Sequence, residues 1–388
     1  MSFKTLDSFN FKGKRVLLRA DLNSDIKDGK ILMSERISEA AVTIKELILK
    51  KARVCVIAHQ GNPGKDDFLG LEQHAVLLNK FVKIKFIKNV IGTEAIDSIK
   101  NLKDGEAILL DNIRFLDDEL EPNKHPVNRL LKVLAPLFDF YVNDAFSVCH
   151  RDHTSISGFP KVLESCAGRL LEKEVKALEK ISIKECLYLL GGAKPEENIK
   201  LLKGKKVLAG GLFGQLCLVA QGKDLGYQNE FLKKATLIKG DYSQFLSTLK
   251  SKLTNVLTPI DFAVDNKGKR EEYDLSLFPL GYEIEDIGPK TLKIYIEEIK
   301  KAPAIFMKGP FGNNTIKQYA KGTIEILKTA SNSKGFSLIG GGHLSEAIEE
   351  SKIPINKFGH VSLSGGALLN YVAGEKLPGL EALGIKQV

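Results

Sequence analysis

The sequence has no tryptophan, three methionines and only five cysteines in 388 residues. The cysteines stand singly, without a CxxC pair, which argues against a disulfide framework and is typical of buried thiols in a reducing compartment. No apolar run approaches the roughly 20 residues that cross a bilayer, and Met1–Leu6 has no apolar signal core. We therefore expect a cytoplasmic protein with no membrane association.

Common signatures of nucleotide and ester chemistry are also missing from the sequence. No GxxxxGK(S/T) occurs, which excludes a P-loop nucleotide site. No GxGxxG opens a helix after a strand with an acidic residue about 20 positions later, so a dinucleotide-binding fold is poorly supported. No Gly-x-Ser-x-Gly elbow occurs, which argues against an α/β-hydrolase.

Positive charge is in modest excess, with 57 Lys+Arg against 48 Asp+Glu and a formal net charge of +9. The lysines are scattered among acidic residues, with no basic block and no aromatic-interleaved basic stripe, so we expect no nucleic-acid partner. General lysine enrichment and an anion-binding cleft explain the positive net charge better than nucleic-acid binding does. The length is too great for one ordinary core and suggests two domains.

Apolar runs that resemble buried strands alternate with helical patterns along the chain. An amphipathic helix is predicted over Gly168–Lys180 and a helical pattern over Ser34–Leu47. Such alternation is typical of parallel sheets covered on both faces. We therefore predict an α/β fold with two doubly wound, mainly parallel-sheet (Rossmann-like) domains joined by a connecting helix. The predicted strands are Arg15–Ala20, Arg53–Ala58, Ala107–Leu110, Phe138–Val142, Cys186–Leu190, Lys206–Leu208, Asn255–Pro259, Ala304–Met307, Phe336–Ile339 and His360–Leu363.

Cationic and polar side chains follow the strands of the first half. They occur in Arg19–Asn23, Ala58–Gly61, Leu110–Arg114 and Val142–Arg151. Because the carboxyl ends of parallel strands lie along one edge of a sheet, we expect these side chains to converge on one crevice. Guanidinium groups grip phosphate and carboxylate at two points, so the crevice suits a small, multiply anionic substrate with hydroxyls. A metal site at His150–His153 is a weaker alternative, since no further ligand-spaced Cys or His accompanies it.

Glycine replaces arginine at the strand ends of the second half. Glycines let backbone N–H groups approach an anion closely, and a following helix adds its positive end. Each turn taken alone is more simply explained by tight packing, but five in one domain favour a phosphate-bearing ligand. The turns are Gly191–Glu196, Gly210–Gly214, Gly309–Gly312, Gly340–His343 and Ser364–Ala367.

Over nearly its full length the chain resembles the phosphoglycerate kinase family, with variants similar to those of the archaeal branch. The resemblance is carried by Arg19–Asn23, Glu35–Ile37, His59–Pro63, Asp111–Phe115, Val142–Ser155, Gly191–Lys194, Gly309–Gly312, Gly340–Gly342, Lys357–Ala367 and Lys376–Leu383. It implies reversible phosphoryl transfer between 1,3-bisphosphoglycerate and ADP, giving 3-phosphoglycerate and ATP, by in-line transfer in a cleft closed by hinge bending. Mg²⁺ would accompany the nucleotide; the residues that hold the metal are unknown.

The resemblance also implies which residues form the two half-sites. Arg36 would stabilise the migrating phosphoryl group and Lys194 would bind nucleotide phosphates. The bland alternative for Arg36 is an ordinary solvated helix residue, and that for Asp21 is a simple pair with Arg19. The implied substrate-binding residues are Asp21, Leu22, Asn23, Arg36, His59, Gln60, Gly61, Asn62, Arg114 and Arg151. The implied nucleotide-binding residues are Gly191, Gly192, Lys194, Gly210, Gly211, Gly309, Pro310, Thr315, Gly340, Gly341, Gly342, His343 and Leu344, with a phosphate-binding helix start at Ser364, Gly365 and Gly366.

The sequence departs from the family pattern at several ligand positions. Asn62 replaces a phosphate-binding arginine, and Asn198 replaces a lysine associated with the transferring phosphate. Thr315 replaces the ribose glutamate, His343 the magnesium aspartate, and Leu344 the following threonine. These changes keep open an alternative function, a catalytically impaired homologue that binds an anionic metabolite or partner.

Domain bounds follow from the same resemblance. We expect a 3-phosphoglycerate domain at 1–165, a connecting helix at 166–181 and a nucleotide domain at 182–370. The C-terminal segment 371–388 would return to the N-terminal domain. We expect a monomer or a homodimer.

Overall fold

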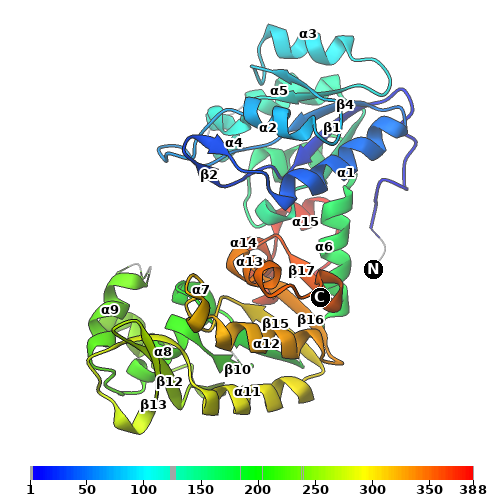
Figure 1. Ribbon diagram of the computed structural model, residues 1–388. Coiled ribbons are helices and arrows are strands. Elements are labelled where there is room, and N and C mark those ends of the chain that lie inside the picture. Colours follow the sequence, from blue (N-terminus) through cyan, green and yellow to red (C-terminus); the bar gives the residue numbers. More distant parts are fainter. Residues whose placement is uncertain are drawn as a thin grey trace. The chain divides into compact units, whose positions relative to one another are not determined.

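The computed structural model describes residues 3–122, 128–183, 185–202, 204–236, 238 and 240–387 (Figure 1). The chain divides into two compact units. The N-terminal unit comprises Met1–Lys176 and Gly374–Val388, and the C-terminal unit comprises Ala177–Ala373. The predicted segments 1–165, 166–181, 182–370 and 371–388 stay predictions. The same holds for the 3-phosphoglycerate role of the first segment and the nucleotide role of the third.

The N-terminal unit is built on a six-stranded sheet of order β5-β6-β4-β1-β7-β8, in which every pairing is parallel. Four of the strands lie at or within two residues of the predicted positions; β7 begins at Phe140 instead of Phe138. The other two, β5 and β8, are short and were not predicted. The strands are β1 (Arg15–Ala20), β4 (Arg53–Ile57), β5 (Lys85–Ile87), β6 (Ala107–Leu110), β7 (Phe140–Asp144) and β8 (Glu164–Ala167).

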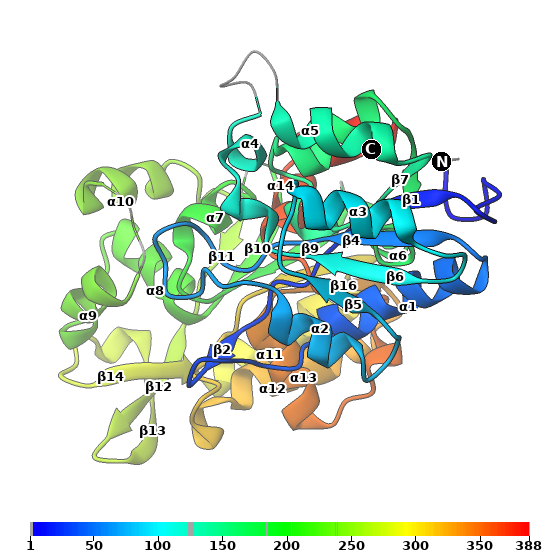
Figure 2. The same ribbon diagram turned by 90° about the horizontal axis from the view of Figure 1, so that it is seen from above.

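Helices cover both faces of this sheet. Figure 2 shows α1 (Glu35–Leu49) and α2 (Glu72–Leu78) on one side of β4 and β6, and α3 (Thr93–Asn101) and α5 (Arg129–Leu134) on the other. A small hairpin, β2 (Ile26–Lys27) and β3 (Lys30–Ile31), and the short helices α4 (Asp117–Leu120) and α15 (Pro378–Ala382) complete the unit.

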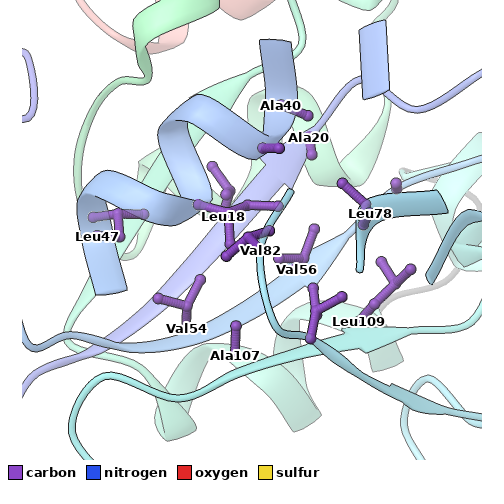
Figure 3. Close-up of a cluster of buried hydrophobic side chains, with 14 of the residues drawn as sticks. Leu18, Ala20, Ala40, Leu47, Val54, Val56, Leu78, Val82, Ala107 and Leu109 are labelled. Atoms are coloured by element: carbon purple, nitrogen blue, oxygen red, sulfur yellow. The ribbon is translucent and has the colours of Figure 1, made fainter. Parts of the chain in front are cut away.

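The alternation of side chains along each strand builds two cores. Leu18 and Val56 pack with α1 and α2 in one buried cluster, which Figure 3 shows. Leu17 and Ile57 belong to the cluster that includes α3 and α5. Since both faces are covered, β4 and β6 are apolar at nearly every position. Only the strand ends are left for polar chemistry.

Helix α6 (Arg169–Lys180) carries the chain from one unit to the other. Its first turn is held by Asp144, whose Oδ1 accepts from the N–H groups of Leu170 (2.8 Å) and Leu171 (3.1 Å). Gly168 precedes the helix because a Cβ there would lie 2.4 Å from Asp144 Oδ1. The predicted connecting helix is therefore present, and it is fixed firmly at its start.

The C-terminal unit repeats the architecture, with a parallel sheet of order β11-β10-β9-β15-β16-β17. Buried residues of α11 (Pro289–Lys301), α12 (Lys321–Ser331) and α13 (Gly342–Ser351) pack on one face. The strands are β9 (Cys186–Leu190), β10 (Lys206–Ala209), β11 (Val256–Leu257), β15 (Ala304–Lys308), β16 (Phe336–Gly340) and β17 (His360–Ser362). The other helices are α7 (Pro195–Ile199), α8 (Gly211–Ala220), α9 (Tyr227–Ala235), α10 (Tyr242–Lys250) and α14 (Gly366–Val372).

A third sheet is antiparallel and was not predicted from the sequence. It has the order β13-β12-β14 and joins β12 (Asp261–Asn266), β13 (Lys269–Asp274) and β14 (Glu283–Ile287). Lys267 and Gly268 turn the first hairpin with φ of +51° and +82°, the signs that a two-residue type I′ turn requires. The predicted α/β class with two parallel sheets is confirmed, with this addition.

Two of the general expectations can be compared with the described part of the chain. All five cysteines are free and buried, and burial raises the pKa of each thiol. Among the described residues, no helix combines the length and the apolar character that crossing a membrane requires.

Candidate functional site

In the N-terminal sheet the strand order reverses at β1, since β4 lies on one side of it and β7 on the other. In a doubly wound sheet, ligands bind beyond the carboxyl ends of the strands at such a point. Asp21 and Asn23 follow β1, and the segment that leads to Arg151 follows β7. The predicted polar residues are therefore placed where the topology favours a ligand.

Arg36 lies in the first turn of α1 and is oriented toward this edge. Its Nη1 is 3.4 Å from Asp21 Oδ1 and 3.4 Å from the carbonyl oxygen of Asn23. Asp21 is buried, whereas a quarter of the Arg36 side chain is exposed. A buried carboxylate thus positions the guanidinium while leaving part of it accessible.

Arg114 has donors that the protein does not satisfy. Its Nη1 donates to the carbonyl oxygen of Gly61 (2.6 Å) and to Asn62 Oδ1 (2.9 Å), but buried Nε and Nη2 have no hydrogen-bond partner. Burial, together with the charges of Arg19 and Arg151, lowers the pKa of Arg114 to about 9. Buried unsatisfied donors are costly, and an anion would satisfy them and relieve the repulsion among the arginines.

His59 is neutral in this setting. Burial, and then the charges of Arg19 and Arg114, hold the pKa of His59 well below its usual value. Its Nδ1 lies 3.0 Å from Arg19 Nη2. Since arginine can only donate, Nδ1 accepts and the ring proton is on Nε2. His59 can therefore offer an N–H to an anion without adding a further charge.

The remaining predicted substrate residues differ in what they present. Asn23 Oδ1 accepts from the N–H of Gly61 (2.8 Å), which connects the loops after β1 and β4. The buried Gln60 side chain bonds both backbone groups of Ser24, at 2.9 and 3.0 Å. Leu22 is fully buried in the core. Gln60 and Leu22 therefore support the loop by packing and internal hydrogen bonds, and only their backbone is left for a ligand.

Sequence reasoning missed the network that holds the cations. Fully buried Arg19 donates from Nε to Ser155 Oγ (2.9 Å), and Ser155 Oγ donates to Glu119 Oε1 (2.7 Å). Glu119 is buried as well, and this burial raises its pKa in spite of nearby Arg19. A charged residue directly after the apolar run Val16–Leu18 of β1 was the available signal. Arg19 orients His59, and Glu119 balances part of the local positive charge.

In the C-terminal sheet the order reverses between β9 and β15. The loops after these strands are joined by bonds from Gly191 N to Lys308 O (2.8 Å) and from Gly192 N to Pro310 O (2.9 Å). A Cβ on Gly191 would lie 2.2 Å from Pro310 O. Tight packing alone therefore requires glycine at position 191, and this glycine does not by itself indicate an anion.

The start of α13 is different. A Cβ on Gly341 or Gly342 would meet no atom within 4 Å, and Gly341 has φ +109°. The same open space surrounds Gly365 before α14, a helix of only seven residues. Open space beside the N-terminus of a helix leaves room for an anion to approach its N–H groups. Leu344, by contrast, is buried in the core, and its side chain is not available to a nucleotide.

A cavity of about 310 Å³ lies in the C-terminal unit. It is lined by five of the predicted nucleotide residues: Gly192, Gly211, Pro310, Thr315 and His343. The lining does not include the predicted residues Gly191, Lys194, Gly210, Gly309, Gly340, Gly341, Gly342 and Leu344. The antiparallel sheet contributes Glu283, Ile284 and Glu285 from β14 to the lining. Because that sheet was not predicted, these lining residues were not predicted either.

The chemistry of this wall favours a neutral group over a phosphate. Burial and the neighbouring carboxylates Glu285 and Asp265 raise the pKa of Glu283, and burial also raises that of Glu285. Asn313 Nδ2 donates to Glu285 Oε2 (2.9 Å). Carboxylates repel phosphate and accept from amino groups. This wall therefore suits a neutral group that donates hydrogen bonds.

Metal-ligating side chains are sparse. Within the described ranges, no group of three or more His, Cys, Asp and Glu is arranged to hold a metal ion. His343 offers nitrogen, whereas Mg²⁺ prefers oxygen ligands. The described residues thus provide no built magnesium site of their own.

Comparison with known proteins places this arrangement in a family. The family model described as phosphoglycerate kinase matches residues 6–375. Phosphoglycerate kinases from Methanopyrus kandleri and Sulfurisphaera tokodaii are 38% and 40% identical, covering 98% and 99% of this chain and 97% and 96% of their own. The crystal structure of the Pyrococcus horikoshii phosphoglycerate kinase is similar with a TM-score of 0.85, 38% identity and 98% of each chain covered. The Coxiella burnetii phosphoglycerate kinase structure gives a TM-score of 0.79 at 30% identity, covering 99% of this chain and 98% of its own.

The match extends over both parallel sheets and over the residues that crowd at their carboxyl edges, so fold, sequence and chemistry agree. This chain belongs to the phosphoglycerate kinase family.

Proposed function

We propose that the N-terminal unit holds 3-phosphoglycerate and the C-terminal unit holds the nucleotide. As a member of its family the chain catalyses reversible phosphoryl transfer between 1,3-bisphosphoglycerate and ADP, giving 3-phosphoglycerate and ATP, a step of glycolysis. The observation that carries the assignment of the two halves is their opposite electrostatics. The N-terminal edge gathers buried arginines, and Arg114 among them has unsatisfied donors, whereas the C-terminal cavity is walled in part by the carboxylates Glu283 and Glu285.

Each half would contribute to an in-line transfer. Arg114, Arg151 and the Nε2–H of His59 bind the phosphate that stays on the glycerate. Arg36, fixed by Asp21, stabilises the migrating phosphoryl group. Phosphoryl transfer needs positioning and charge neutralisation more than covalent protein chemistry. No general base is required, because the attacking carboxylate is already ionised near neutrality.

Magnesium is part of the proposal as a companion of ATP and ADP. Mg²⁺ keeps most of its waters and is commonly bound through substrate phosphates. It would supply charge neutralisation on those phosphates. Since the described side chains form no metal cluster, we assign no residue to it. A cytoplasmic location and a monomer or homodimer remain part of the same proposal.

The impaired-binder alternative finds no support among the relatives, which are named as phosphoglycerate kinases. A coupled assay on the purified wild-type chain, with 3-phosphoglycerate and Mg-ATP, decides between the two functions. We expect ATP-dependent phosphorylation. Glycerate binding in calorimetry without any turnover would instead establish the binder.

A further inference from the structure

Lys308 ends β15, the strand beside β9 at the point where the order of the C-terminal sheet reverses. It pairs in register with Leu190 on one side and with Gly340 on the other. Both neighbours lead directly into glycine-rich turns. The lysine is thus centred on the carboxyl edge where a doubly wound sheet binds its ligand.

The ammonium of Lys308 is largely buried and held from two sides. Its side chain is 14% exposed, and Nζ lies 2.9 Å from Glu197 Oε2 and 3.1 Å from Asn198 Oδ1. Asn198 is itself fully buried and donates from Nδ2 to the carbonyl oxygen of Gly191 (2.9 Å). One asparagine therefore connects the lysine to the loop that carries Lys194.

Burying the Lys308 ammonium costs desolvation free energy. An ion pair with Glu197, whose side chain is 40% exposed, is too weak to offset that cost. Burial and the charge of Lys194 both lower the pKa of Lys308, against the pull of Glu197. Like charges repel, and a polyanion that contacts both ammonium groups would turn that repulsion into attraction.

We propose that Lys308 is a phosphate-binding residue of the nucleotide site, acting together with Lys194. Its position compensates for Asn198, one of the positions at which this chain departs from the family pattern. Asn198 fixes the ammonium through its side-chain oxygen, and Glu197 keeps it charged until phosphate oxygens replace that contact. The inference rests on the proposed placement of the nucleotide in the C-terminal unit.

Calorimetric titration of the full chain with Mg-ADP tests the proposal, together with an NMR titration using adenosine, which has no phosphate. We expect Lys308→Asn to weaken Mg-ADP binding about 10- to 100-fold, the range for a lost charge-assisted contact. Adenosine binding should stay within about 2-fold, because the base does not contact the lysine. Lys206→Asn is the matched control, since Lys206 starts β10 at the opposite edge of the same sheet and pairs with Glu298.

A charge exchange guards against loss of fold. The double variant Asn198→Lys/Lys308→Asn moves the ammonium group from position 308 to position 198, its present hydrogen-bond partner. We expect most of the Mg-ADP affinity to return in this variant. Wild-type affinity for Mg-ADP in Lys308→Asn would overturn the proposal, as would equal losses for Mg-ADP and adenosine. Absence of Mg-ADP binding by the wild type would overturn the placement of the nucleotide as well.

Discussion

Arg114 is the side chain whose environment most clearly lacks a partner. Two of its donors are buried and unsatisfied, and other arginines crowd it. We expect Arg114→Met to raise the KM for 3-phosphoglycerate at least about 10-fold, because a phosphate would lose a charge-assisted hydrogen bond. The KM for ATP should stay unchanged. Steady-state kinetics with each substrate varied in turn measures both constants.

Arg53→Met is the control for this variant. Arg53 begins β4, at the amino edge of the same sheet, and its Nε forms an exposed pair with Asp104 at 2.7 Å. It should leave both KM values as in the wild type. If Arg114→Met raised the KM for ATP instead, glycerate and nucleotide would have been assigned to the wrong halves.

At this scale the sequence predicts residues that belong to a contiguous pattern, such as Arg36 and Arg114. It singles out Arg19 but does not reveal its role, because that role depends on Ser155, which is 136 positions away in the chain. Nor does it show that the Gln60 side chain bonds the backbone of Ser24, in the loop after β1. These roles are decided by which atoms the fold brings together, which spacing along the sequence does not contain.

At the scale of the element, α6 depends on one arginine. Arg169 donates to Glu46 (2.6 and 2.7 Å), to Asp7 (2.8 and 2.9 Å) and to Glu172 (2.7 Å). A lysine cannot reproduce this fork. Because Asp7 is exposed and solvent screens it, we expect Arg169→Lys to lower the free energy of unfolding by only about 1 kcal/mol. Urea unfolding followed by circular dichroism measures the loss.

Lys173→Met provides the comparison for that helix. Lys173 forms an exposed pair with Glu39 at 3.2 Å and should contribute less than about 0.5 kcal/mol. Equal losses in both variants would mean that the Arg169 fork does not anchor α6.

Asp144 makes the start of α6 sensitive to pH. Burial raises the pKa of Asp144 to about 7 from its ordinary 3.8, against the bonds it accepts. The folded protein therefore retains a proton that the unfolded chain releases above pH 4. The resulting stability is fully present below pH 4 and is lost as the pH rises to 7, by about 4 kcal/mol in all.

Asp144→Asn removes this titration. Between pH 5 and pH 8 we expect the stability of the wild type, relative to the variant, to fall by about 3 kcal/mol. Urea unfolding at the two pH values gives the difference. A constant offset between wild type and variant would show that Asp144 does not titrate in this window.

Long strands with a continuous apolar run, such as β1 and β9, are predictable to the residue. The two short strands of the N-terminal sheet are not, since β5 carries only Lys85–Ile87 and β8 mixes Glu164 and Ser165 with small residues. The antiparallel sheet was missed because β13 is almost entirely polar. Its pairing is decided by the turn at Lys267 and by packing, not by periodicity.

At the scale of the whole molecule, two parallel sheets of the same design bear different chemistry at their carboxyl edges. Buried arginines gather at the N-terminal edge, whereas glycine-rich turns and Lys308 mark the C-terminal edge, with carboxylates added by β14 of the third sheet. The alternation of strands and helices was enough to predict this architecture. Where the chain passes from one compact unit to the other, and which unit takes the C-terminal residues, depends on tertiary contacts. If the units contribute separate half-sites, as we propose, activity requires the whole chain.

The central claim is that cations of the N-terminal edge stabilise a phosphoryl group in transfer, and Arg36 tests it most directly. The measurement is kcat in the coupled assay for the wild type, Arg36→Ala and the control Arg53→Ala. We predict that Arg36→Ala lowers kcat by roughly 10³- to 10⁵-fold, the range for an arginine on a transferring phosphoryl group. Arg53→Ala should match the wild type. A kcat for Arg36→Ala within about 10-fold of the wild type would contradict the account.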